Sequence, residues 1–238
     1  MVTVVVAVLW GALAGALLPR AAYRLSVPPE EPWRDRCPEG HPLGGLLGRA
    51  RCPECARAYG PGPVVPALLT ALLCAGLALA TGPRPELVVW LAAGPVGVLL
   101  AIVDVRVQRL PDVLTLPLAA VVPALLGVAA LLPDHAGHWP TALLAALALG
   151  AGYLVLHEIN PGGMGFGDVK LALGAGAALG WYGWRTVLLG TFVAFVCGAV
   201  YGGVLAVVRR TGRGTAVPFG PFLLAGAYAG VVLEAAAV

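Results

Sequence analysis

The chain has 238 residues, of which 59% are hydrophobic and only 11% are charged, and its formal net charge is +3. Because soluble domains contain about a quarter charged residues, this composition excludes a soluble globular protein. It predicts an all-α fold, a polytopic bundle of membrane helices.

Apolar runs long enough to cross a bilayer define the predicted helices, since a membrane helix needs roughly 20 mostly apolar residues. Eight runs bounded by charged residues or proline fit this criterion: Val2–Leu18, Val64–Ala80, Leu87–Val103, Val113–Leu132, Thr141–Leu156, Val169–Gly183, Thr186–Val208 and Val217–Leu233. We therefore expect about eight transmembrane helices. The chain is expected to divide into a first helix (1–18), a polar loop (19–63) and a transmembrane core (64–238).

Basic residues are distributed unevenly between the loops of this frame. Only Arg84 and Arg185 fall on one side. The other thirteen fall on the opposite side: Arg20, Arg24, Arg34, Arg36, Arg49, Arg51, Arg57, Arg106, Arg109, Lys170, Arg209, Arg210 and Arg213. By the positive-inside rule that side is the cytoplasm, so both termini are expected outside. The expected location is the inner (plasma) membrane. The first run has no basic residues ahead of it, so we interpret it as a retained helix rather than a signal peptide.

The polar loop has the residue pattern of a metal site. Cys52 and Cys55 have the C-x-x-C spacing of a zinc knuckle, and Cys37 and His41 precede them in the same loop. Four such ligands complete a closed tetrahedral site, which is structural rather than catalytic. A disulfide is the alternative, and a reducing cytoplasm disfavours it. We predict a structural Zn²⁺ at these four residues.

Two aspartates border the apolar runs on the predicted cytoplasmic side. Asp104 directly follows the third run and Asp168 opens the sixth, so both reach the same membrane face although they are 64 residues apart. The glycines before Asp168 permit a sharp turn and close approach to a neighbouring helix such as the third. Two adjacent carboxyls do not both ionise easily, and such a pair suits a general acid and a general base acting on one water.

Other polar residues near the runs have simpler interpretations. A lone Asp at a helix end is often a cap, and Asp112 is expected to cap the fourth helix. His157 and Glu158 end the fifth run, where they can be solvated. Cys74 and Cys197 lie inside apolar runs and are expected to be small core residues.

The sequence resembles the type IV prepilin peptidases, the GxGD class of membrane aspartic proteases, over essentially its whole length. Gly165-Phe166-Gly167-Asp168 reads as the GxGD motif and is followed by Val169-Lys170. The segment from Asp104 to Asp112 is similar to the family's Asp segment, and Pro218-Phe-Gly-Pro-Phe222 is similar to its late helix signature. The cysteine loop occupies the position of the family's zinc-binding loop.

The resemblance implies cleavage of the basic leader peptide from type IV prepilins or pseudopilins at the cytoplasmic membrane face. Asp104 and Asp168 would form the catalytic pair, acting through an activated water without a covalent intermediate. Gly165, Gly167, Lys170 and Asp112 would support the motif, with Lys170 either pairing with a catalytic carboxylate or reaching the headgroups.

The resemblance also bears on cofactors and partners. Many members N-methylate the new N-terminus with S-adenosylmethionine, using a longer loop that carries two C-x-x-C pairs. Here Cys37-Pro-Glu-Gly-His41 replaces the first pair, so this cofactor is expected only if the methyltransferase activity is retained. The expected partners are prepilins or pseudopilins with basic leaders and membrane lipid, and no nucleic acid.

A transporter or proton-coupled channel that uses the aspartates as a relay is the alternative function. It predicts carboxylates spread through the membrane depth, whereas here the candidates lie at one face.

Overall fold

The computed structural model describes residues 1–28, 30–209 and 217–238, and within them the fold is all-helical, with two isolated β-bridges in the polar loop. The eight predicted helices are confirmed. They are α1 (Val2–Leu25), α2 (Val64–Thr81), α3 (Glu86–Val107), α4 (Asp112–Ala129), α5 (Trp139–Ile159), α6 (Phe166–Trp181), α7 (Trp184–Arg209) and α8 (Gly220–Ala235). Six of these are long and apolar enough to cross a membrane, whereas α6 and α8 have 16 residues each.

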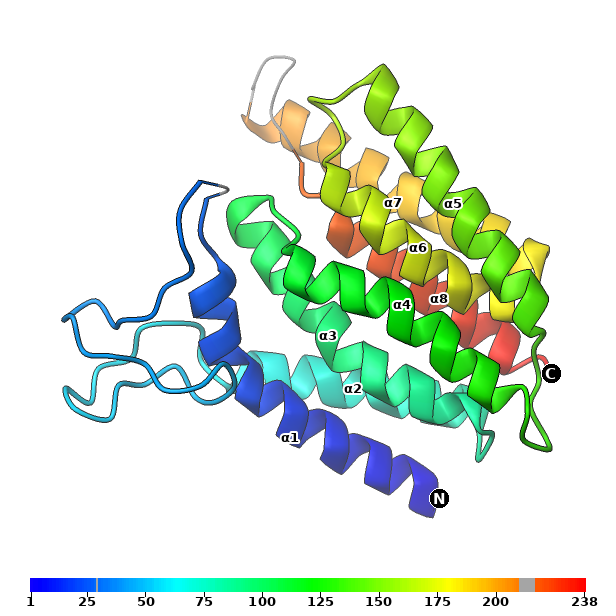
Figure 1. Cartoon of the computed structure of the whole chain (residues 1–238), viewed down its shortest axis with the longest axis horizontal. Coiled ribbons are helices and arrows are strands. Elements are labelled where there is room, and N and C mark those ends of the chain that lie inside the picture. Colours follow the sequence, from blue (N-terminus) through cyan, green and yellow to red (C-terminus); the bar gives the residue numbers. More distant parts are fainter. Residues whose placement is uncertain (29, 210–216) are drawn as a thin grey trace.

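Consecutive helices run in opposite directions, so the bundle has two distinct ends (Figure 1). We call the aspartate end the one formed by the C-termini of α1, α3, α5 and α7 and the N-termini of α2, α4, α6 and α8. The polar loop projects from this end, and both chain termini lie at the opposite end. Of the basic residues predicted on this side, Arg210 and Arg213 lie outside the described residues.

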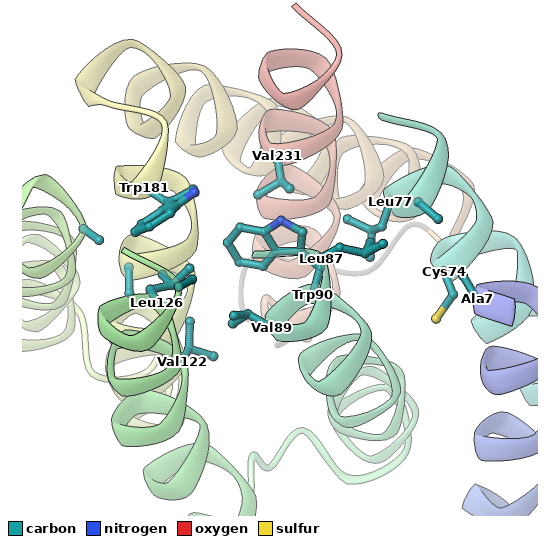
Figure 2. Packing of buried hydrophobic residues seen from close by; sticks show 14 of the residues in the cluster. Ala7, Cys74, Leu77, Leu87, Val89, Trp90, Val122, Leu126, Trp181 and Val231 are labelled. Atoms are coloured by element: carbon teal, nitrogen blue, oxygen red, sulfur yellow. The ribbon is translucent and has the colours of Figure 1, made fainter. Parts of the chain in front are cut away.

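Close helix contacts depend on small residues. In α1, a Cβ added to Gly11 or Gly15 would lie 2.7 or 2.4 Å from a backbone carbonyl of α2. In α6, a Cβ added to Gly176 would lie 2.6 Å from the Ala145 carbonyl of α5. Such spacing lets backbones approach closely, and packing rather than hydrophobicity holds helices together in lipid. Larger side chains fill the centre, where Trp90 of α3 points toward Val231 of α8 (Figure 2).

The first helix extends beyond its predicted end at Leu18 because a proline does not terminate it. Pro19 has no N–H and interrupts the helical hydrogen bonds. The backbone of Gly48 binds next to this interruption: its N–H donates to the Leu17 carbonyl (2.7 Å), and its carbonyl accepts from the Arg20 N–H (3.0 Å). The polar loop therefore completes the hydrogen bonding of α1, which bends near this point (Figure 1).

Candidate active site and metal centre

Asp104 is held at the aspartate end by the start of another helix. It lies in the last turn of α3 and is only 4% exposed. Its Oδ2 accepts a hydrogen bond from the N–H of Gly220, the first residue of α8, at 3.0 Å. The unpaired N–H groups and the dipole of a helix N-terminus favour negative charge, so α8 stabilises this carboxylate.

Asp168 is held by the first turn of its own helix. It is 6% exposed, and its Oδ2 accepts a hydrogen bond from the Gly165 N–H at 3.1 Å. The Asp168 N–H in turn donates to the Gly165 carbonyl at 3.0 Å. Its second oxygen, Oδ1, is buried and has no hydrogen-bond partner among the described residues. One oxygen therefore fixes the carboxyl while the other is free to act on a bound molecule.

The turn between α3 and α4 brings the two aspartates together. Leu110 in this turn is 7% exposed and packs between the starts of α6 and α8. A Cβ added to Gly167 would lie 2.7 Å from the Leu110 Cβ, and a Cβ added to Gly220 would lie 2.8 Å from the Asp104 Oδ2. The turn therefore places the Asp104 and Asp168 carboxyls at neighbouring helix ends.

α6 packs closely on neighbouring helices, as expected, but α3, the neighbour named as an example, is not one of them. In the described residues, no Cα of α3 lies within 8 Å of a Cα of α6. Instead α6 packs on α4, α5 and α8. The aspartates approach each other only at the helix ends, where the start of α8 contacts Asp104 and Leu110 packs against Gly167.

The close packing of Gly167 against Leu110 leads to a testable prediction. Gly167→Ala should displace Leu110 and destabilise the bundle by roughly 1–3 kcal/mol, the usual cost of overpacking. Gly162→Ala is the matched control in the turn just before α6, because among the described residues its Cβ would meet only the Asn160 side chain, at 3.9 Å. Thermal unfolding in detergent should show a lower midpoint for Gly167→Ala alone. Equal midpoints for both variants would contradict the steric role of Gly167.

Lys170 and Asp112 form an ion pair between α6 and α4. Lys170 Nζ lies 2.6 Å from Asp112 Oδ1 and 5.0 Å from the centre of the Phe166 ring. Asp112 is not the cap of α4 that the sequence predicts, because it is already the first helical residue and Pro111 occupies the cap position without a side-chain hydrogen bond. Lys170 accordingly pairs with Asp112 and not with Asp104 or Asp168.

The α5–α6 turn is held by His157, whose Nδ1 lies 2.8 Å from the Met164 carbonyl and so donates a hydrogen bond to it. Glu158 is exposed, as expected for a solvated residue.

Two polar residues of interest lie inside the bundle and are not predicted by the sequence analysis. Tyr153 of α5 is 1% exposed, and its hydroxyl has no hydrogen-bond partner among the described residues. Glu86 is fully buried at the opposite end and accepts a hydrogen bond from the Ala136 N–H at 3.2 Å. A tyrosine inside a run of Ala and Leu is the available signal for the first; Glu86 directly precedes a predicted helix and resembles an ordinary helix-flanking charge.

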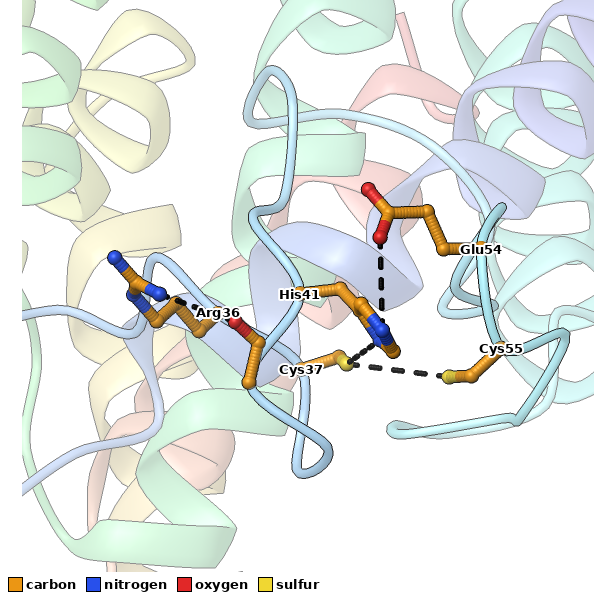
Figure 3. Close-up of polar contacts among 6 residues, drawn as sticks. Arg36, Cys37, His41, Glu54 and Cys55 are labelled. Atoms are coloured by element: carbon orange, nitrogen blue, oxygen red, sulfur yellow. Dashed lines mark hydrogen bonds and ion pairs between the residues drawn. The ribbon is translucent and has the colours of Figure 1, made fainter.

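The four predicted metal ligands converge in the polar loop. The ligand atoms of Cys37, His41, Cys52 and Cys55 all lie within 4.8 Å of one another. Cys37 Sγ is 3.4 Å from His41 Nδ1 and 4.0 Å from Cys55 Sγ, and Figure 3 shows these three side chains pointing toward one another. A tetrahedral zinc with bonds of roughly 2.3 Å separates its ligand atoms by about 3.8 Å, so the cluster fits this ion.

Local backbone structure explains how the ligands are placed. Each ligand pair lies in a turn closed by a β-bridge, Arg36 with Pro42 and Arg51 with Ala58. A hydrogen bond from the Cys55 N–H lowers the pKa of Cys52 to about 7, which favours the thiolate that metals bind.

The environment of His41 also fits a metal ligand. The Oε2 of Glu54 lies 3.5 Å from Nε2, the ring nitrogen that faces away from the thiols. Carboxylates commonly orient metal-binding histidines in this way. The residues present therefore fit the predicted Zn²⁺.

The polar loop is attached firmly to α1. Arg20 and Arg24 donate hydrogen bonds to the carbonyls of Gly44 and Gly45, respectively, and the rings of Tyr23 and Tyr59 pack in a tilted arrangement with centroids 4.8 Å apart.

The two remaining cysteines differ from each other. Cys74 is fully buried, as predicted. Cys197 is exposed rather than a core residue, because α7 packs mainly on α8 and turns most of its surface outward.

Comparison with known proteins agrees with the family resemblance of the sequence. Residues 91–203 match the profile of the type IV leader peptidase family. Several curated relatives carry the name prepilin leader peptidase/N-methyltransferase. The protein of Aeromonas salmonicida is 33% identical over 84% of this chain and 70% of its own length. The protein of Stutzerimonas stutzeri is 29% identical over 92% of this chain and 87% of its own length. No solved structure matches the chain significantly.

Proposed function

Because this chain belongs to the type IV leader peptidase family, we propose that it is a membrane aspartic endopeptidase that removes the basic leader peptide from type IV prepilins or pseudopilins. We assign Asp104 and Asp168 as its catalytic pair. This assignment rests on two buried carboxyls, from α3 and α6, at the same end of the bundle, and on Oδ1 of Asp168, which has no hydrogen-bond partner among the described residues.

The chemistry requires one water and two carboxyl groups. The ionised carboxylate takes a proton from water, and the resulting hydroxide forms a C–O bond to the scissile carbonyl. The protonated carboxyl gives its proton to the amide nitrogen as the C–N bond breaks. The pair then exchanges protons and returns to its starting state, without a covalent intermediate on the protein.

The surrounding backbone orients this pair. The N–H groups of Gly220 and Gly165 each hold one carboxylate oxygen at 3.0 and 3.1 Å. Groups fixed before the reaction lower the cost of reorganising the site in the transition state. The starts of α8 and α6 therefore act as the rigid supports of the two acids.

The position of the site relative to the membrane follows from charge. Thirteen of the fifteen basic residues fall, by sequence, on the same side of the predicted membrane helices as the two aspartates. The positive-inside rule assigns this side to the cytoplasm. We therefore place cleavage at the cytoplasmic face of the inner membrane. In this proposal residues 64–238 form the peptidase core, and the loop 19–63 with its Zn²⁺ braces α1 against that core.

Incubation of the purified chain in liposomes with a prepilin tests the proposal. Mass spectrometry should find one cut, at the end of the basic leader. A new N-terminus heavier by one methyl group, appearing only with S-adenosylmethionine, would add methyltransferase activity to the assignment. An intact prepilin combined with proton-dependent solute flux in the same liposomes would overturn it in favour of a transporter.

A further inference from the structure

An apolar groove lies where α3 and α6 fail to meet. Its volume is about 430 Å³, and α2, α3, α4, α6 and α8 all contribute to its wall. Among the residues that the structure describes, no charged residue lines it, and only Trp90 and Tyr228 bring polar side-chain atoms. The groove therefore suits an apolar occupant of the membrane interior.

Helical spacing connects this groove to the aspartates. On α3, the lining residues Trp90, Gly94, Gly97 and Ala101 recur every three or four positions, and the next position of the series is Asp104. Residues at this spacing share one helix face.

The same holds on α6. Ala178, Gly174 and Leu171 line the groove at the same spacing, and the next position toward the start of the helix is Asp168. On α8 the lining begins at Pro221, directly after the Gly220 N–H that holds Asp104. Three walls of the groove therefore end at the two carboxyls.

We propose that this groove holds an apolar helix that directly follows the scissile bond in the substrate; this inference rests on the proposed function. From Trp90 to Ala101 the groove follows about 16 Å of helix, or roughly three turns. A helix lying along α3 presents its cytoplasmic end to Asp104 and Asp168. Glycine and alanine on α3 and α6 let a second helix approach closely, which is how helices associate in lipid.

The glycines of the groove allow a sharp test. A Cβ at Gly97 would lie 3.4 Å from Leu224 Cδ2, which is an ordinary contact, so Gly97→Leu adds volume to the groove without forcing backbones apart. Gly152→Leu on the outward face of α5 is the matched control, since its Cβ would meet nothing within 4 Å. Cleavage is measured with full-length prepilin and with a peptide whose apolar segment is cut short.

Gly97→Leu should raise KM for the full-length prepilin at least about tenfold, or ~1.4 kcal/mol, and leave cleavage of the short peptide unchanged. Gly152→Leu should change neither. Unchanged cleavage of full-length prepilin by Gly97→Leu, or equal losses with both substrates, would overturn the assignment.

A photo-crosslinker in the substrate's apolar helix provides the second measurement, independent of whether the short peptide is cleaved. Crosslinks should map to the lining segments of α3, α6 and α8. Crosslinks to α5 or α7, or occupation of the groove by a co-purified lipid or a second copy of the chain, would overturn it. If the wild type cleaves no prepilin, the proposed function itself fails; cleavage without crosslinks in the groove rejects only this inference.

Discussion

Asp104→Asn and Asp168→Asn should each reduce prepilin cleavage by at least about 100-fold, because each removes one member of an acid–base pair. Asn is nearly the same size as Asp, and its carbonyl oxygen can accept the same N–H from Gly220 or Gly165. The variants should therefore keep their fold. The rate of leader removal in liposomes and the thermal midpoint are measured together.

Glu158→Gln is the matched control for this experiment. It neutralises an exposed carboxyl at the same end of the bundle and should cleave at the wild-type rate. Processing by either aspartate variant at more than about a tenth of the wild-type rate would reject the catalytic pair.

Cys52→Ser should release the metal and unfold the polar loop while the helices persist. Structural zinc contributes roughly 10–16 kcal/mol to the folding of small metal-dependent segments, so a loop of this size loses its order without it. The purified wild type should contain one zinc per chain and the variant none. Limited proteolysis should then cut the variant between α1 and α2, where the wild type resists.

Cys197→Ser makes the same chemical change on the outer face of α7 and should keep both the metal and the protease resistance. Acidification should also release the zinc, since protons compete for the thiolate of Cys52, whose pKa is about 7. Full metal content in Cys52→Ser would rule out this ligand set.

Hydropathy predicts the helices of this protein well because each must be apolar along its length in order to enter the bilayer. Hydropathy misplaces a helix end where a hydrogen bond from a distant part of the chain replaces a local one. Pro19 reads as the end of the first helix, yet the backbone of Gly48, 29 residues later, binds beside the break and α1 continues.

The sequence predicts that Asp104 and Asp168 lie at one end of the bundle, but it does not predict the contacts that hold them. Topology alone places Asp104 and Asp168 at one end. Nothing local to Asp104 indicates that the N–H of Gly220, 116 residues away, holds it. Asp112 likewise has the position of a cap by sequence, and its partner Lys170 is 58 residues away.

The supports of the two aspartates are main-chain N–H groups, which nearly every amino acid supplies. Side-chain substitutions around the pair therefore leave its hydrogen bonds in place, and tolerance to mutation should be high there. Tolerance to mutation should be low only where an added Cβ would clash with neighbouring atoms, at Gly167 and Gly220. In random mutagenesis, substitutions of the other neighbours of the two aspartates should be tolerated, whereas substitutions of these two glycines should not. After the aspartates themselves, the smallest residues of the site are therefore the least replaceable.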